Sequence, residues 1–255
     1  MAAQPHRVKF EQAPASAAPL VNFEPASWPR VTRRLVFIQS LLGIGAELTL
    51  ALPYLRRVHG LQRLNPARRY LFVANHVSLL DTILLGALAW RSRCYPILVL
   101  GDKHVWHASW FKRFLSSPIG FLVERGRSNP GRIRELQAFG RAGGEFHLFV
   151  FPEGTRGDGV TVRPCQPGIY YIAQEARLPL VPVFLANMQL VSTKHGRFHP
   201  ISGLRKVDVH FGEPIEPEDY LSLPREEFPE FVRRGIAGVK PAPAEERSSP
   251  VPLPG

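Results

Sequence analysis

One histidine and one aspartate stand close enough in the sequence to work together as an acid–base pair. In the segment FVANHVSLLD, residues 72–81, His76 follows a strand-like run and Asp81 comes five positions later. On one continuous helix, side chains five positions apart differ by about 140° and face different ways. If His76 lies in a turn and Asp81 in the first turn of the helix that follows, the two can meet. An aspartate bonded to one imidazole nitrogen leaves the other nitrogen free as a base.

A purely structural role explains the same residues without any chemistry. Ser78 and Asp81 have the spacing of a capping box, in which a serine starts a helix and an acidic residue three positions later bonds back to it. His76 would then be a polar turn residue. The end of a candidate sheet strand is nevertheless where α/β folds bind ligands, so both interpretations stay open at this point.

The sequence offers His76 no nucleophile of its own. It contains no GxSxG elbow, no HExxH motif and no Cys/His cluster that would hold zinc. His104 and His107 stand at helical spacing but lack a third ligand, so we expect no metal. A His/Asp base without a partner serine or cysteine indicates that a bound substrate supplies the nucleophile, for instance a hydroxyl.

Glycine-rich and basic segments follow other strand-like runs. The segment FPEGTRGDG, residues 151–159, predicts a turn whose backbone N–H groups and Arg156 could bind an anion. Arg125 and Lys103 each come shortly after a further strand-like run. Cations at the ends of successive strands should converge on one edge of a sheet, although each segment alone could be an ordinary solvated loop.

The composition bounds the class of protein. The chain has 255 residues, 45% of them hydrophobic, which is enough for one sizeable core. A formal charge of +11 favours an anionic partner: a nucleic acid, a membrane surface or a phosphorylated substrate. The basic residues are dispersed and no zinc-finger or RNP-like signature appears, which argues against nucleic acid. Two distant cysteines, Cys94 and Cys165, indicate core residues in a reducing compartment.

The elements that must position these side chains alternate along the chain. Strand-like runs fall at residues 70–75, 95–101, 120–124, 146–151, 178–185 and 206–212. Helical patterns lie near residues 79–91, 106–116, 130–142 and 168–177. This alternation predicts an α/β fold with a mixed, largely parallel sheet flanked by helices.

An apolar segment precedes this alternating region. Residues 35–55 approach the roughly 20 residues that cross a bilayer. Gln39, Gly43 and Glu47 recur at four-residue spacing and form a less apolar stripe on one helical face. A glutamate is costly in lipid unless it faces protein or water. We therefore expect an N-terminal membrane-associated helix that lies in the plane or is half inserted, with a buried core helix as the alternative.

Four segments, in this order, resemble the glycerolipid acyltransferase family, which includes 1-acylglycerol-3-phosphate acyltransferases. NHVSLLD matches the N-H-x-S-x-x-D block of that family, and FPEGTR matches its third block. GFLVER resembles the second block, a glycine followed five residues later by arginine, and LPLVPV resembles the fourth. The match covers roughly residues 70 to 215, and the first and third blocks as a pair are its most specific part.

The resemblance implies a mechanism and a set of site residues. His76 would be the general base on a glycerol-type hydroxyl, with Asp81 orienting the imidazole. The freed oxygen would attack the thioester of acyl-CoA or acyl carrier protein directly, and these donors are substrates, so no cofactor is implied. The acceptor would be bound by Lys103, Arg125, Glu153, Gly154, Thr155 and Arg156.

The resemblance also implies partners and a location. The partners are a membrane surface, a lysophospholipid acceptor and the acyl donor, and the location is the cytoplasmic face of a membrane, the inner membrane if the source is bacterial. Family frequency favours 1-acyl-sn-glycerol 3-phosphate, giving phosphatidic acid in phospholipid biosynthesis. Val123 and Gly157-Asp158 depart from the family pattern, so other lysolipid acceptors stay open. A non-catalytic lipid-binding protein on the same fold is a further alternative.

The expected domain organisation follows from these assignments. It comprises a flexible lead over residues 1–30, a membrane-associated helical segment over 31–68, an acyltransferase catalytic domain over 69–240 and a disordered tail over 241–255.

Overall fold

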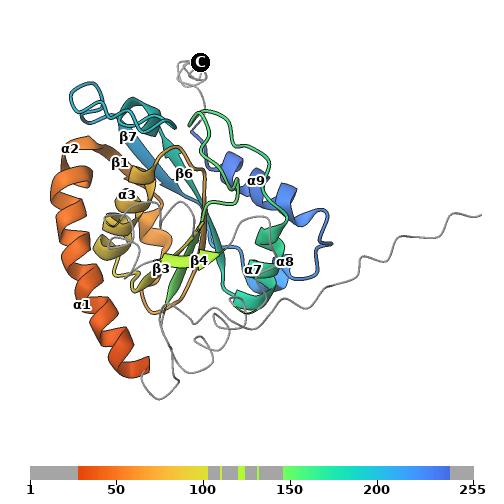
Figure 1. Cartoon of the computed structure of the whole chain (residues 1–255). Coiled ribbons are helices and arrows are strands. Elements are labelled where there is room, and N and C mark those ends of the chain that lie inside the picture. The colour runs from red at the N-terminus through yellow and green to blue at the C-terminus, as the bar shows by residue number, and fades with distance from the viewer. Residues whose placement is uncertain (1–27, 103–109, 111–119, 124–130, 132–145, 242–255) are drawn as a thin grey trace, which may run out of the picture.

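The computed structural model describes residues 28–102, 110, 120–123, 131 and 146–241 (Figure 1). Lys103 and Arg125 lie outside these residues. So do the helical patterns expected near 106–116 and 130–142, apart from the single positions 110 and 131.

The described strands form one seven-stranded sheet in the order β1-β7-β6-β2-β5-β3-β4. Their bounds are β1 Leu55–His59, β2 Leu71–Ala74, β3 Ile97–Asp102, β4 Gly120–Val123, β5 His147–Val150, β6 Leu180–Ala186 and β7 Val207–Phe211. Every neighbouring pair is parallel except β6 and β7. The prediction of an α/β fold with a mixed, largely parallel sheet is therefore confirmed.

Helices cover both faces of this sheet (Figure 1). The helical elements are α1 Trp28–Ala46, the π-helix η2 Glu47–Ala51, α2 Leu52–Tyr54, η3 Leu61–Arg63, α3 Leu79–Arg91, α7 Gly168–Ala176, η4 Met188–Leu190, α8 Pro217–Tyr220 and α9 Phe228–Gly238. Helices α1 and α3 lie on one side of the sheet, and α7 and α9 on the other. The central strands β2, β5 and β6 are buried at every position, which explains why their sequences are continuous apolar runs rather than alternating ones.

The N-terminal helix turns its less apolar stripe toward the protein. The side-chain amide of Gln39 hydrogen-bonds both the N–H and the C=O of Ile97, each at 2.7 Å. One turn further, Gly43 is packed so closely on Trp90 that a Cβ would lie 2.6 Å from that side chain. Another turn on, Glu47 forms an ion pair with Arg91 of α3. The stripe is thus the packing surface of the helix.

The opposite face of α1, and of the η2 and α2 turns that continue it, is apolar and exposed. Its residues are Phe37, Ile38, Leu41, Ile44, Leu48 and Leu52. The stretch Val36–Tyr54 is long and apolar enough to cross a membrane by length and composition alone. A core helix of a soluble protein buries its apolar face and exposes its polar face. This helix does the reverse, since its polar stripe packs on the protein and its apolar face is exposed.

Strand β1 and helix α9 were not predicted from the sequence. Within β1, two exposed arginines follow the buried Leu55, so the segment resembles a basic flank more than a strand. It pairs in parallel with β7 at the edge of the sheet. Helix α9 buries Phe228, Val232 and Ile236, which recur at four-residue spacing against the sheet. The domain boundaries remain a prediction.

Candidate active site

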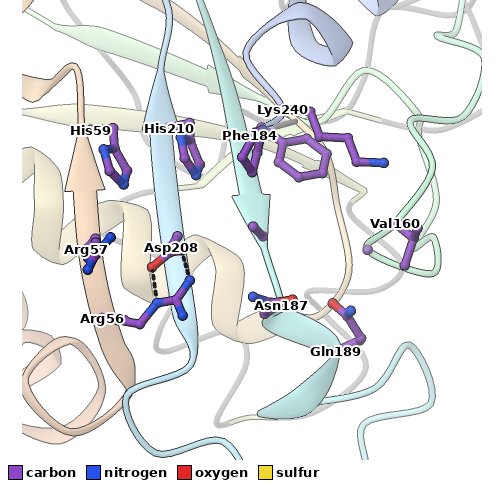
Figure 2. A pocket seen from close by; sticks show the side chains of 13 residues that line it. Arg56, Arg57, His59, Val160, Phe184, Asn187, Gln189, Asp208, His210 and Lys240 are labelled. Atoms are coloured by element: carbon purple, nitrogen blue, oxygen red, sulfur yellow. Dashed lines mark hydrogen bonds and ion pairs between the residues drawn. The ribbon is translucent and has the colours of Figure 1, made fainter. Parts of the chain in front are cut away.

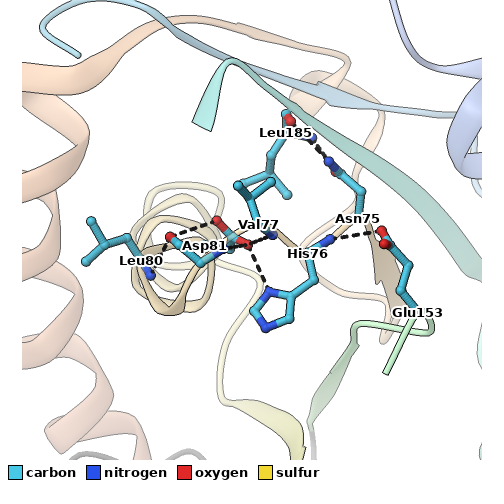
Figure 3. Close-up of polar contacts among 8 residues, drawn as sticks. Asn75, His76, Val77, Leu80, Asp81, Glu153 and Leu185 are labelled. Carbon is cyan, nitrogen blue, oxygen red and sulfur yellow. Dashed lines mark hydrogen bonds and ion pairs between the residues drawn. The ribbon is translucent and has the colours of Figure 1, made fainter. Parts of the chain in front are cut away.

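The turn between β2 and α3 contains the first group of site residues (Figure 3). Ser78 is the N-cap of α3 in an extended conformation, and its Oγ accepts a hydrogen bond of 3.1 Å from the Leu80 amide. Asp81, three positions later, accepts a 2.8 Å bond from the Ser78 amide. The predicted capping box is therefore present, and it fixes where the helix begins.

The same carboxylate also reaches back to the histidine. Oδ2 of Asp81 lies 2.9 Å from Nδ1 of His76, and it accepts the Val77 amide as well (Figure 3). Asp81 is completely buried, whereas the His76 side chain keeps 20% of its surface exposed. Because Nδ1 faces a carboxylate, we assign the ring hydrogen to Nδ1, which leaves the lone pair of Nε2 free to accept a proton.

An aromatic stacking contact and the hydrogen bonds of a neighbouring asparagine fix the position of this histidine. The imidazole of His76 stacks on Phe151, with 4.2 Å between ring centroids and 23° between planes. The amide side chain of Asn75 bonds the Leu185 carbonyl at 3.2 Å and the Leu185 amide at 2.7 Å. Neither Phe151 nor Asn75 was assigned a role from the sequence, although each is the first residue of a motif singled out there.

Glu153 holds the main chain of the histidine turn. It is 2% exposed, and its Oε1 accepts a 3.1 Å bond from the His76 amide. On the carbonyl side of the same residue, the Gly157 amide donates to the His76 C=O at 2.7 Å. Burial raises the pKa of Glu153 to about 7, while the main-chain amides of His76 and Arg163 oppose the rise. The loop over residues 151–159 therefore holds the main chain of His76 by hydrogen bonds on both sides.

The turn within this loop leaves one cation available to a ligand. Gly154 adopts a φ of +64°, which a side chain would strain, and its amide bonds the Phe151 carbonyl. The amides of Gly154 and Gly157 are thus already used, so the expected backbone cradle for an anion is only partly free. Thr155 is half-buried, whereas Arg156 is exposed and has no ion-pair partner among the described residues.

The sheet topology sets where the strands that precede the remaining predicted cations end. Strands β3 and β4 run parallel to β5, and β5 runs parallel to β2. Their carboxyl ends therefore point to the same edge of the sheet as His76. Lys103 follows β3 directly and Arg125 comes two residues after β4, but both lie outside the described residues, so their place in the site remains a prediction.

Comparison with known proteins adds a family to this geometry. The profile described as Acyltransferase matches residues 55–186, which is just over half of the chain. The 1-acyl-sn-glycerol-3-phosphate acyltransferase of Saccharomyces cerevisiae is 30% identical over 174 residues, covering 64% of this chain and 53% of that protein. The human 1-acyl-sn-glycerol-3-phosphate acyltransferase alpha is 28% identical over 194 residues, covering 74% and 63%.

A relative with another acceptor in its name is also similar. The lyso-ornithine lipid O-acyltransferase of Pseudomonas aeruginosa is 33% identical over 142 residues, covering 55% of this chain and 51% of that protein. The chain therefore spans between half and two-thirds of the length of these curated relatives.

A solved structure shares the fold. The crystal structure of the 1-acyl-sn-glycerophosphate (LPA) acyltransferase PlsC from Thermotoga maritima matches with a TM-score of 0.57 and 20% identity, covering 86% of this chain and 84% of that one. The order of the motifs, the sheet that carries them and the match of the profile to residues 55–186 lead to one conclusion: this chain belongs to the acyltransferase family.

Proposed function

We propose that this protein transfers a fatty acyl group from the thioester of acyl-CoA or acyl carrier protein to the free hydroxyl of a lysolipid. The observation that carries this proposal is the 2.9 Å contact between His76 Nδ1 and the buried carboxylate of Asp81. That contact fixes the tautomer of an imidazole whose other nitrogen has no partner among the described residues. A fixed, partly exposed imidazole is suited to take a proton from an alcohol.

His76 and Asp81 can carry out the transfer in two steps. Nε2 of His76 accepts the hydroxyl proton as the oxygen forms a bond to the thioester carbonyl carbon. The tetrahedral intermediate then breaks its C–S bond, and the leaving thiolate takes the proton back from the imidazolium. Asp81 stabilises the positive ring throughout, because its Oδ2 lies 2.9 Å from Nδ1 and is held there by two main-chain amides. Ester and thiol are the products, and no acyl-enzyme is required.

The acceptor we favour is 1-acyl-sn-glycerol 3-phosphate, which would give phosphatidic acid. Several relatives named as 1-acyl-sn-glycerol-3-phosphate acyltransferases support this choice. The exposed guanidinium of Arg156 lies one residue before the amide that bonds the His76 carbonyl, so it can hold an acceptor phosphate near the base. Lys103 and Arg125 are proposed to add charge from the neighbouring strand ends, and Thr155 to contact the glycerol part.

A second acceptor class is favoured by one observation. The relative named as a lyso-ornithine lipid O-acyltransferase is 33% identical, slightly more than the phosphate-named relatives over its shorter match. Acylation of an amino-acid-containing lysolipid would use the same base and the same donor. The difference would lie in the group that Arg156 meets, a phosphate diester or carboxylate rather than a phosphate monoester.

We further propose that the outer face of α1 enters the membrane. Because Gln39 and Glu47 are covered by the protein, only the opposite apolar face is open to lipid. The loop over residues 193–206 extends this surface: it is tied to α2 by hydrogen bonds from Arg205 to Pro53 and from Lys206 to Tyr54. It exposes the apolar side chains Phe198, Ile201 and Leu204. This arrangement fits a helix that lies in the interface better than one surrounded by lipid.

One experiment tests the proposed chemistry. The detergent-solubilised protein is incubated with acyl-CoA or acyl carrier protein and a panel of lysolipids, and thiol release and product mass are measured. Thiol release that depends on one acceptor, and a product heavier by one acyl group, are expected. Tight lysolipid binding without any thiol release would instead identify a non-catalytic lipid-binding protein.

A further inference from the structure

A groove unrelated to the predicted acceptor residues opens on the sheet beside the histidine turn (Figure 2). It has a volume of about 660 Å³ and lies across β1, β7 and the end of β6. Phe184 and Ala186 of β6 form part of its lining, and the 151–159 loop supplies Gly159. None of the groups described above for acyl transfer lines it.

The groove carries an excess of positive charge. Arg56, Arg57 and Lys240 line it, whereas Asp208 is the only carboxylate in the lining. That carboxylate is neutralised, because both of its oxygens are bonded by the guanidinium of Arg56. The Arg56 guanidinium in turn holds the pKa of Asp208 below its ordinary value, against the effect of burial. Arg57 and Lys240 are exposed, so their charges are available to an anion.

Two histidines stack on each other in the same groove. His59 on β1 and His210 on β7 are register partners, and their rings stack with 4.5 Å between centroids and 8° between planes (Figure 2). Histidine rings are surfaces on which nucleobases stack. The groove therefore combines two features that suit a phosphorylated nucleotide, a set of cations and a planar ring.

The same histidines could in principle hold a metal with Asp208. The ligand atoms of His59, Asp208 and His210 all lie within 4.8 Å of one another. However, Arg56 occupies the carboxylate, and Arg57 and Lys240 line the same groove. Three fixed or exposed cations oppose the entry of a divalent metal ion. The charge around the cluster thus favours an anionic ligand over a cation.

The groove adjoins the catalytic turn directly. A Cβ on Gly159 would lie 3.1 Å from the side chain of Val77, which follows His76 in the chain. Two residues earlier in the same loop, the Gly157 amide bonds the His76 carbonyl. One wall of the groove is therefore packed against the turn that carries the base. A ligand in the groove could extend a flexible arm from there to His76.

The strand order places the groove to one side of the strand that carries the base. In the sequence β1-β7-β6-β2-β5-β3-β4, His76 follows β2, the central strand. The groove occupies β6, β7 and β1 on one side. Strands β3 and β4 lie on the other side. A ligand in the groove thus approaches the base from the β6 side of β2.

We propose that this groove binds the 3′-phosphorylated nucleotide diphosphate of an acyl-CoA donor. The proposal rests on the proposed acyl-transfer function for the identity of the ligand. Arg57 and Lys240 bind its phosphates, the ring of His59 stacks on its base, and the pantetheine arm carries the thioester over Gly159 to His76. An acyl carrier protein brings a single phosphate and no base, so the groove also selects between the two donor types.

The test measures equilibrium binding of desulfo-CoA and of adenosine 3′,5′-diphosphate to the full chain in detergent. A charge-assisted phosphate contact that is lost should weaken binding at least about tenfold. We therefore expect Arg57→Ala and Lys240→Ala each to weaken binding by that factor. The control is Arg234→Ala on α9, which removes another exposed arginine, paired with Glu230 and outside the groove, and should bind like wild type.

Kinetics then assign the groove to one substrate. The groove variants should raise the KM for acyl-CoA and leave the KM for the lysolipid unchanged. A raised lysolipid KM with an unchanged donor KM would overturn the proposal, because the groove would then be the acceptor site. Wild-type affinity for desulfo-CoA in both groove variants would also overturn it. So would Zn²⁺ binding that is lost in His59→Ala with no nucleotide binding.

The binding measurement separates this proposal from the function on which it rests. His76→Ala should bind desulfo-CoA with wild-type affinity even though it cannot turn over. If no lysolipid is acylated but the groove variants still lose desulfo-CoA binding, the nucleotide site stands and the proposed reaction fails. If acyl carrier protein supports turnover and desulfo-CoA does not bind at all, the reaction stands and the nucleotide site is wrong.

Discussion

Oδ2 of Asp81 lies 2.9 Å from Nδ1 of His76 and at the same time accepts two main-chain amides at the start of α3. The helix cap and the His/Asp pair, which the sequence presents as alternatives, are therefore one arrangement. The helix start supplies hydrogen bonds that hold the carboxylate in a fully buried position. The carboxylate in turn fixes the imidazole.

Replacement of His76 by alanine should abolish most of the turnover. A general base contributes about 10² to 10⁴ in rate, so we expect kcat to fall by at least that lower factor. The side chain is partly exposed, so the melting temperature should change little. Thiol release and thermal unfolding measure the two quantities. His195→Ala, at an exposed position, is the matched control; near-normal turnover in His76→Ala would remove the residue from the mechanism.

Variants of Ser78 and Asp81 should separate the two roles of the turn, which are to cap helix α3 and to orient His76. Ser78→Ala removes the N-cap and should cost about 0.5–2 kcal/mol of unfolding free energy, with kcat close to wild type. Asp81→Asn removes the negative charge that stabilises the imidazolium, while its single oxygen can still take the place of Oδ2, which bonds both the amides and the ring. We therefore expect its kcat to fall by about 10² or more.

Urea unfolding and turnover on both variants check this separation. If Ser78→Ala loses as much activity as Asp81→Asn at equal stability loss, the carboxylate acts only through the fold.

Much of the fold could be predicted because its signals are local. The start of α3 at Leu79 follows from the Ser78 cap, and the strands that carry the motifs are continuous apolar runs. Strand β1 could not be predicted, because its exposed arginines are explained only by an edge position beside β7 and by Asp208, which lies over 150 residues away. Its pairing with β7 depends on the tertiary fold and leaves no local signal in the sequence.

The site shows the same division between local and distant signals. The meeting of His76 and Asp81 could be predicted from spacing and a helix start. The burial of Glu153 could not, since a carboxylate in a glycine-rich segment is ordinarily a surface residue, and only the fold brings it to the His76 amide. Likewise, the Gln39 stripe was visible in the sequence, but its partner Ile97 lies 58 positions away.

Arg156 should affect acceptor binding more than the chemical step. Because its guanidinium is exposed and unpaired among the described residues, Arg156→Ala should leave stability unchanged. Loss of a charge-assisted phosphate contact should raise the acceptor KM about tenfold or more for a lysolipid with a phosphate monoester. Steady-state kinetics with varied acceptor measure this effect.

The control for Arg156 is Arg68→Ala, which removes an arginine paired with Glu216 near the start of β2, at the opposite edge of the sheet. It should keep the wild-type acceptor KM. Unchanged acceptor KM and kcat in Arg156→Ala would show that the phosphate is bound elsewhere.

Glu153 should make the stability of the protein depend on pH near neutrality. Burial raises its pKa from an ordinary 4.5 to about 7, so the folded state favours the protonated form. Its stabilising contribution is complete below about pH 4.5 and is lost as the pH rises through about 7. A shift of this size corresponds to a loss on the order of 3 kcal/mol between these limits.

Urea unfolding between pH 5 and 8 tests this dependence in wild type and in Glu153→Gln. The amide keeps an oxygen for the His76 N–H but does not titrate, so the variant should lose much less stability as the pH rises. Glu175→Gln, at an exposed position on α7, should follow wild type. Parallel curves for wild type and Glu153→Gln would show that Glu153 does not titrate in this range.

The exposed apolar face of α1 and η2 should determine membrane association. Leu48 is 62% exposed on the side of the helix away from the protein, so Leu48→Glu should leave the melting temperature nearly unchanged. Burial of an ionised side chain in the interface is unfavourable, so binding to vesicles should weaken.

The control is Tyr171→Glu on α7, an exposed apolar residue on the other side of the sheet (Figure 1). Vesicle co-sedimentation with anionic lipid measures both. If the two variants bind vesicles equally well, the helix does not enter the bilayer, and the exposed apolar face must be covered by another protein surface.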